Sequence, residues 1–163
     1  MSTSTRRAAA VLAVFVAGAL LGAGALAAVR ATPAPVQRIP LAAADNPTGG
    51  KGRTLGLTKV LIPAHAAIAL HRHPGTQVAY IASGTVTYSV RKGGVTVMSE
   101  TPGESPNQVE KIGPGQSGKI AAGEWIVEQP NTVHSGANNT AKPVVIYLAT
   151  LFPIGSAPSI PVK

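Results

Sequence analysis

The chain has 163 residues and no cysteine, with 14 Lys and Arg residues against 6 Asp and Glu and a formal net charge of +8. This length suits one domain with a hydrophobic core. The lack of cysteine excludes disulfide bonds and thiolate metal sites, so a metal ion would need nitrogen or oxygen ligands. The basic residues are scattered mostly singly and aromatic residues are few, which argues against nucleic-acid binding.

The N-terminal segment predicts export. A short polar, positive stretch that ends at Arg7 precedes a long uncharged apolar run, and Ala25-Leu26-Ala27 offers the small residues of a cleavage site. Residues 1–27 are therefore interpreted as a signal peptide. The run over residues 8–29 is also near the roughly 20 residues that span a bilayer, so a retained membrane anchor is the alternative. Either interpretation predicts an exported domain that is secreted, periplasmic or anchored on the extracytoplasmic side of a membrane, and that meets the membrane only through an uncleaved N-terminal segment.

The rest of the chain predicts a single all-β domain. Residues 28–52 are rich in Pro, Ala and Gly and are interpreted as a linker. Residues 53–152 hold short β-prone runs separated by Gly, Pro, Asn or Ser, which is typical of a sandwich or barrel. Residues 153–163 are expected to form a C-terminal tail.

Three of the four histidines have a spacing that suits a metal site. Side chains two residues apart in a strand point to the same face, so His71 and His73 would project together. The turn at Pro74-Gly75 would bring Gln77 towards the same point. His134 lies far along the chain but in a similar turn-to-strand context. A histidine pair alone is a weak signal, because surface or core histidines are common.

Two stretches strengthen this prediction by resemblance. "HRHPGTQVAYIASG" (71–84) and "GEWIVEQPNTVHSGAN" (123–138) resemble the two motifs of the cupin superfamily, in particular its small single-domain monocupins with a type-2 conserved barrel. The resemblance implies a small jelly-roll β-barrel over residues 53–152. It also implies one divalent metal ion held inside by His71, His73, His134 and the residue at position 77, and pairing of two chains as a homodimer.

The chain departs from the family pattern at three positions. Gln77 stands where a glutamate ligand is usual, and His65 and Asn131 stand where glycines are usual. His65 is expected to be a solvent-exposed turn residue, and Asn131 is expected to accept a left-handed backbone conformation.

Gln77 bears on the chemistry because an amide carries no negative charge. With three neutral imidazoles, the ion would keep its full charge, bind less tightly and attract hydroxide or an anionic ligand more strongly. Gln77 is either the fourth ligand or a donor to whatever binds the ion. Manganese, nickel, copper, zinc and iron remain open, and the missing carboxylate argues mildly against iron oxygenase chemistry.

Three functional interpretations remain from the residues. The protein is a metal-binding barrel for a small organic ligand, anionic or neutral, or a metal-dependent enzyme such as a dioxygenase or an isomerase/lyase, or a metal-free barrel that binds a small molecule. No catalytic residue is assigned. Tyr80 and Tyr88 are candidates to line the cavity, Trp125 is expected in the core, and Glu128 is expected to face solvent together with Glu124.

Overall fold

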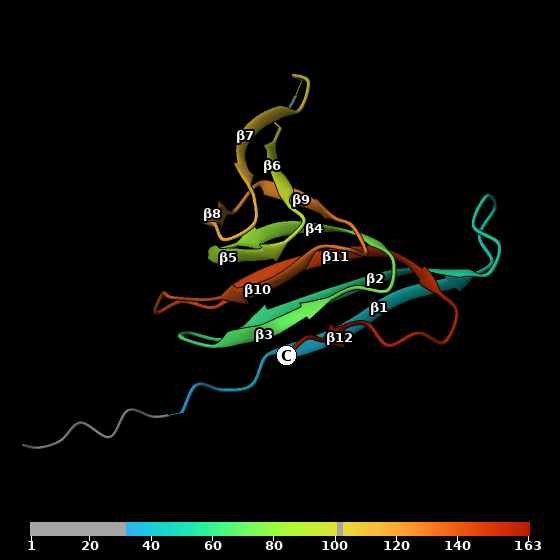
Figure 1. Ribbon diagram of the computed structural model, residues 1–163, viewed down its shortest axis with the longest axis horizontal. Helices are drawn as coiled ribbons and strands as arrows, with labels where there is room; N and C mark the ends of the chain where they lie inside the picture. Colours follow the sequence, from blue (N-terminus) through green and yellow to red (C-terminus); the bar gives the residue numbers. More distant parts are fainter. Residues whose placement is uncertain (1–31, 101–102) are drawn as a thin grey trace, which may run out of the picture. The chain divides into compact units, whose positions relative to one another are not determined.

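The computed structural model describes residues 32–100 and 103–163, which form two antiparallel sheets without a helix (Figure 1). In the seven-stranded sheet the spatial order is β1-β2-β11-β4-β9-β6-β7. Its strands are β1 (Gln37–Asp45), β2 (Arg53–Ile62), β11 (Val144–Pro153), β4 (Thr76–Ser83), β9 (Glu124–Glu128), β6 (Val95–Ser99) and β7 (Asn107–Ile112).

The second sheet has five strands in the order β12-β3-β10-β5-β8. They are β12 (Ile160–Pro161), β3 (Ala67–Arg72), β10 (Val133–Ala137), β5 (Thr85–Lys92) and β8 (Ser117–Ala121). Strands that are distant in sequence are neighbours in both sheets, as β11 is between β2 and β4. This arrangement confirms the predicted all-β, jelly-roll-like barrel.

The hydrophobic core lies between the sheets, and strict alternation along the strands builds it. In β4, Ala79 and Ile81 are buried while Val78 and Tyr80 face outward. The same period places buried apolar side chains from both sheets in one cluster. Its members on the other core strands include Val60, Ile62, Val86, Val90, Ile120, Ile126, Ile146 and Leu148. Every side chain at an inward-facing position of a strand therefore points into the barrel, whether it is apolar or polar.

The structure differs from the sequence interpretation at both ends of the barrel. Part of the expected linker, residues 37–45, forms β1, which pairs with β2 over nearly its whole length. Part of the expected tail forms β12, which pairs with β3 opposite His71 and Arg72. Every residue of β1 is exposed, so this edge strand has no hydrophobic alternation that could reveal it in the sequence. The barrel therefore extends beyond residues 53–152.

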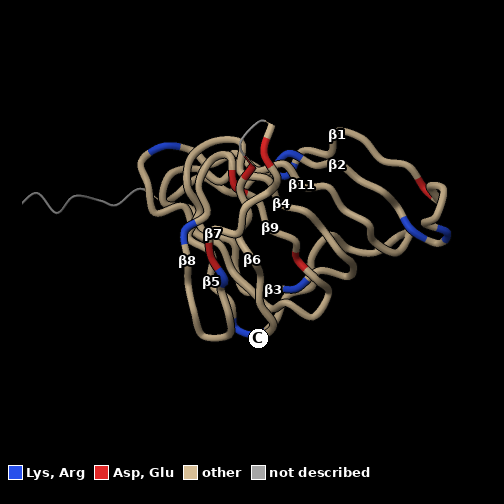
Figure 2. Tube along the Cα trace, turned by 90° about the horizontal axis from the view of Figure 1, so that it is seen from above, with Lys and Arg blue, Asp and Glu red and all other residues tan. Residues whose placement is uncertain are grey.

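The predicted N-terminal signal peptide or anchor falls within residues 1–31, outside the described residues. Among the described residues, no helix is long and apolar enough to span a membrane. Lys and Arg occupy several separate segments of the trace (Figure 2).

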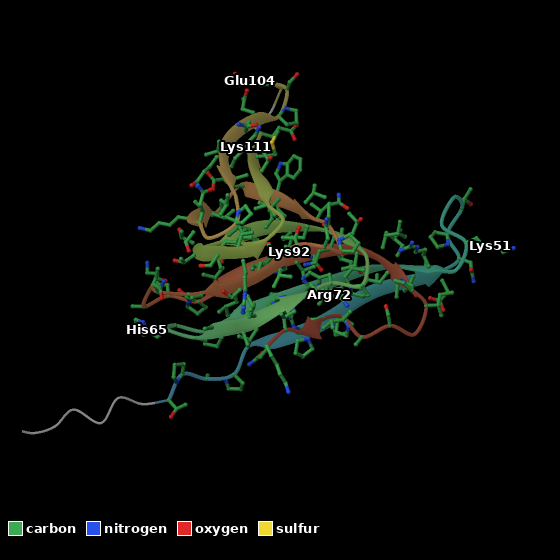
Figure 3. All side chains as sticks on the ribbon, viewed as in Figure 1. Lys51, His65, Arg72, Lys92, Glu104 and Lys111 are labelled. Carbon is green, nitrogen blue, oxygen red and sulfur yellow. The ribbon has the colours of Figure 1, made fainter. Side chains whose placement is uncertain are left out.

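Two turn positions adapt to residues that are not the usual glycines. His65 is exposed at the turn between β2 and β3, as predicted, and has a left-handed φ of 60° (Figure 3). Asn131 is not among the residues with positive φ, so the expected left-handed conformation at that turn is wrong. The turn around Asn131 is closed instead by a hydrogen bond from the amide of Thr132 to the carbonyl of Gln129. Gly84, which ends the first motif, has a φ of 80° between β4 and β5.

Candidate metal centre

Three buried imidazoles converge on one point inside the barrel. His71 is the last residue but one of β3, His73 directly follows that strand, and His134 lies in β10, opposite His71 in the antiparallel register. Their exposed fractions are only 6%, 2% and 3%. One ring nitrogen from each lies within 4.8 Å of the others, which makes this group suitable for a single metal ion. The predicted meeting of these three histidines is therefore confirmed.

Backbone carbonyls orient the three rings. Each histidine directs Nδ1 to a carbonyl oxygen, which leaves Nε2 on the opposite side of the ring for the cavity. The contacts are His71 with Ala69 at 2.7 Å, His73 with Pro158 at 2.8 Å and His134 with Thr132 at 3.4 Å. A proton held on Nδ1 in this way leaves the Nε2 lone pair free, as metal-binding histidines require. The chemistry of this donor set fits a divalent transition-metal ion.

The turn between β3 and β4 requires a glycine. A side chain at Gly75 would collide with the carbonyl of Leu151 and with the ring and backbone of Phe152. The resulting close approach to β11 places His73 beside Phe152, with the rings stacked at a centroid distance of 5.8 Å. The turn then leads into β4, where Gln77 points inward and is 4% exposed. The predicted approach of Gln77 to the histidines is observed, with its Nε2 3.0 Å from His73 Nε2.

The centre also contains a carboxylate. Glu128 is 3% exposed, so its expected position facing solvent is wrong. It shares the inward face of β9 with the core residue Ile126, whereas Glu124 lies at the start of that strand and accepts a hydrogen bond from the amide of Ala121. Glu128 is two residues from Ile126 and so shares its face of the strand. Because isoleucine is usually buried, this spacing is the sequence signal that could have predicted a buried Glu128.

Glu128 has four polar neighbours in the cavity. The hydroxyl of Tyr88 donates to Oε1 at 2.8 Å, and the amide nitrogen of Gln77 donates to Oε2. His134 Nε2 lies 3.0 Å from Oε1, and His73 Nε2 lies 3.6 Å from Oε2. The buried carboxylate is therefore fully surrounded by donors or by nitrogens that could share a metal ion with it.

Burial and mutual charge set the protonation states. Burial lowers the pKa of His71 from 6.5 to about 4, against the opposing effect of its hydrogen bond to Ala69, and burial also lowers the pKa of His73. Burial alone would raise the pKa of Glu128, but its contacts with His134, His73 and Gln77 prevail and hold that pKa at about 2. Burial and the charge of Glu128 raise the pKa of Tyr88 above its usual value of 10. Near neutral pH this gives neutral imidazoles at His71 and His73, an ionised Glu128 and a protonated Tyr88.

The space at this centre is small and opens next to a larger hollow. A cavity of about 50 Å³ is lined by the histidines, Gln77, Tyr88, Glu128 and apolar core residues. A neighbouring hollow of about 220 Å³ shares four lining residues with it. These shared residues are Arg38, His73, Gln77 and Leu148. A water molecule needs roughly 10–15 Å³ of such volume, so the inner cavity suits an ion and a few small ligand atoms.

Arg38 stands at the junction of the two spaces. It comes from β1, in the segment that the sequence predicts as linker, and its place at the cavity depends on the pairing of β1 with β2. Within the described residues, its guanidinium group takes part in no ion pair or side-chain hydrogen bond. Among the described residues, it is the one Lys, Arg, Asp or Glu side chain that lines the larger hollow. Arg38 therefore gives the larger hollow a positive charge at its junction with the inner cavity, where the ionised Glu128 lies.

The aromatic candidates Tyr80, Tyr88 and Trp125 occupy different surroundings. Tyr88 lines the cavity and stacks on His134 at a centroid distance of 4.9 Å, while Tyr80 is 44% exposed on the outer sheet face. Trp125 is only partly buried and lines a surface hollow with Met98 and Val127, so its expected place in the core is wrong. The inward-facing position of β9 is taken by the next residue, Ile126, and Trp125 is the register partner of Met98 in β6.

Solved structures share this architecture. The chain is similar to a cupin superfamily protein from Desulfitobacterium hafniense, with 10% identity, coverage of 76% of this chain and 84% of that chain, and a TM-score of 0.50. A protein from Klebsiella pneumoniae with a double-stranded beta-helix domain has 15% identity, coverage of 82% and 88%, and a TM-score of 0.45. A recombinant oxalate oxidase in complex with glycolate has 16% identity, coverage of 80% and 57%, and a TM-score of 0.49.

No family model matches the sequence, and no curated protein matches it. At identities this low, the similarity to solved structures concerns the fold.

Proposed function

Because the chain has a cupin-type fold with three converging imidazoles, we propose that it binds one divalent metal ion through His71, His73 and His134, together with a small organic anion. The observation that carries this proposal is the orientation of the rings. All three Nδ1 atoms contact backbone carbonyls, so the tautomer that carries its proton on Nδ1 offers three Nε2 lone pairs to one ion. Such an ion supplies Lewis acidity and exchangeable coordination positions.

The ligand class follows from space and charge. The inner cavity is too small for a large aromatic molecule, so a ligand that reaches the ion must extend into the neighbouring hollow past Arg38. A guanidinium group without a protein partner is suited to a carboxylate, which it can hold through two parallel hydrogen bonds. We therefore propose a small organic acid with one oxygen near the ion and a carboxylate near Arg38.

Metal content of the full chain tests the first part of the proposal. The parent should retain close to one zinc, copper, nickel, manganese or iron ion per chain after gel filtration. The triple variant His71→Ala, His73→Ala, His134→Ala should retain none. The matched control is His65→Ala, because this fourth histidine is exposed at a turn and should leave the metal content unchanged. Equal metal content in the parent and the triple variant would contradict the proposal and favour the metal-free binding barrel.

A metal-dependent enzyme is the second candidate, and Tyr88 is the observation that favours it. Its hydroxyl lies at the cavity wall, donates to Glu128 and is protonated at neutral pH, so it could give a proton to a bound anion. Oxygen uptake and substrate consumption with panels of diketones, catechols, flavonols and small hydroxy acids test the dioxygenase and isomerase/lyase forms. Turnover that is lost in Tyr88→Phe would support this candidate, and inactivity across the panels would favour binding.

We also propose that the domain acts outside the cytoplasm and as a homodimer. Export rests on the apolar run that follows Arg6-Arg7. Dimerisation is supported by an outer face of the seven-stranded sheet that carries exposed apolar side chains on neighbouring strands. These include Leu55, Leu57, Val78, Tyr80, Tyr147 and Leu151. Signal-peptide cleavage in a secretion assay and sedimentation of the purified chain measure the two properties.

A further inference from the structure

Gln77 and Glu128 occupy directly opposite positions on adjacent strands. They are register partners in the antiparallel pair of β4 and β9, and both side chains point into the barrel. Register partners on one face have side chains in direct contact. A carboxylate on β9 can therefore reach nearly the same space as a carboxylate at position 77 would.

The distances of Glu128 from the histidines match those between ligands of one ion. Its Oε1 lies 3.0 Å from His134 Nε2, and its Oε2 lies 3.6 Å from His73 Nε2. Two donor atoms that each bind an ion at roughly 2.0–2.2 Å are separated by about 3.0 Å at a right angle and about 3.5 Å at a tetrahedral angle. The carboxylate thus stands among the donor atoms of the histidine group.

The amide of Gln77 presents its nitrogen, and not its oxygen, to this group. One neighbour is the Glu128 carboxylate, which only accepts hydrogen bonds. In the metal-free chain the other is His73 Nε2, which also accepts because Nδ1 of the same ring donates to the carbonyl of Pro158; a bound ion would take over this lone pair. An NH₂ group can donate to both, whereas an amide oxygen could donate to neither. The amide nitrogen has no lone pair to offer a metal ion, so Gln77 is suited to hold Glu128.

We infer that Glu128 is the fourth protein ligand of the ion and that Gln77 is a positioning residue that holds its carboxylate. This inference rests on the proposed metal site and adds one negative charge to its set of protein ligands. Three neutral imidazoles and one carboxylate leave an excess charge of +1 on a divalent ion, whereas a ligand set that ends in an amide would leave +2. The site then binds its ion more tightly than the sequence suggests and still attracts a single anionic ligand.

Zinc titration of the metal-free full chain, in competition with a chromophoric chelator, tests the inference. Glu128→Gln preserves the shape of the side chain and should weaken zinc binding by more than about 100-fold, beyond the roughly 10–100-fold that loss of an orienting contact costs. Glu124→Gln is the matched control, because it makes the same chemical change on the same strand outside the cavity, and its affinity should stay within about twofold of the parent.

The exchange variant Gln77→Glu, Glu128→Gln separates loss of a ligand from general damage. It returns a carboxylate to the same space from the other strand, so it should recover zinc affinity to within about tenfold of the parent. The visible absorption of the cobalt-loaded chain supplies a second readout. Its d–d bands should shift in Glu128→Gln and return towards those of the parent in the exchange variant.

Each result identifies which claim fails. Parent-like zinc affinity and cobalt bands in Glu128→Gln would overturn the inference, while loss of binding in the triple histidine variant would keep the proposed metal site. If Glu128→Gln does not fold, the exchange variant decides: recovered affinity supports a carboxylate ligand, and weak binding by a folded exchange variant overturns it. A parent chain that binds no zinc and no cobalt would reject the proposed function itself.

Discussion

His71 and His134 lie directly opposite each other across β3 and β10, with ring centroids 4.3 Å apart. These strands belong to the five-stranded sheet, whereas Gln77 and Glu128 come from the seven-stranded sheet. The polar centre therefore joins the two halves of the barrel through its buried side chains. Changes in its charge should consequently affect the stability of the whole domain as well as metal binding.

The metal-free domain should lose stability as the pH falls from 6.5 to 4. The folded-state pKa of His71 is about 4, below the value of 6.5 in an unfolded chain. The unfolded state therefore takes up the proton first, so the contribution of the neutral imidazole is complete above pH 6.5 and is lost as the pH falls towards 4. Glu128 acts in the same direction at lower pH, between about 4.5 and 2.

Urea denaturation of the chelator-treated chain between pH 7.5 and 4 measures this dependence. His71→Asn should flatten the curve between pH 6.5 and 4. A free energy of unfolding that stays constant or rises as the parent is acidified over this range would contradict the assigned protonation states.

Replacing His65 by glycine should stabilise the domain. His65 holds a left-handed backbone conformation with its side chain exposed, and a glycine adopts that conformation without steric cost. We expect His65→Gly to raise the free energy of unfolding by about 0.5–1 kcal/mol in urea denaturation. Ala64→Gly, at the preceding position without positive φ, should instead be neutral or destabilising. Equal effects of the two substitutions would contradict the conformational explanation.

Asn138 should be essential for stability although it lies outside the metal centre. It is completely buried, and its amide nitrogen contacts the carbonyls of Ile62, Pro63 and Lys142 at 2.8–3.0 Å. Asn138→Ala removes the donor to these carbonyls, so we expect a loss of about 3 kcal/mol in thermal or urea unfolding.

The neighbouring Asn139 provides the control for that substitution. It is exposed and forms one side-chain hydrogen bond, to Thr87 at 2.9 Å. Asn139→Ala should therefore cost less than about 0.5 kcal/mol. Similar losses in the two variants would contradict the special role of Asn138.

Arg38 should determine the affinity for small carboxylates. We expect Arg38→Gln to weaken the binding of acetate or oxalate to the metal-loaded chain by about tenfold, because a charge-assisted hydrogen-bond pair is lost at the cavity mouth. Isothermal titration calorimetry measures this loss. Arg91→Gln, an exposed residue of β5 that lines neither space, should leave the affinity unchanged. Equal carboxylate affinity in the parent and Arg38→Gln would show that Arg38 has no part in ligand binding.

The sequence predicted the parts of the site that depend on local periodicity. The HxH spacing places His71 and His73 on one face of an extended segment, and the Pro74-Gly75 turn returns Gln77 to them. The resemblance of the second motif added His134, whose position opposite His71 depends on strand pairing that no local pattern encodes.

The sequence could not predict contributions that depend on tertiary closure. Arg38 lies on an edge strand without hydrophobic alternation, and the carbonyl that orients His73 comes from Pro158 in the expected tail. The sequence predicts that Glu128 faces solvent, because Glu124 lies four residues earlier on the same face of the strand. The sheet gives these two glutamates different surroundings, since only Glu128 lies opposite an inward-facing residue of β4.

X-ray absorption spectroscopy of the zinc-loaded full chain shows whether a single ion is bound by the three buried histidines. The multiple-scattering pattern of imidazole counts the histidines bound to the ion. We predict three imidazoles together with oxygen donors in the parent, and the same spectrum in His65→Ala. A spectrum dominated by oxygen, with one imidazole or none, would place the ion outside the barrel and contradict the account.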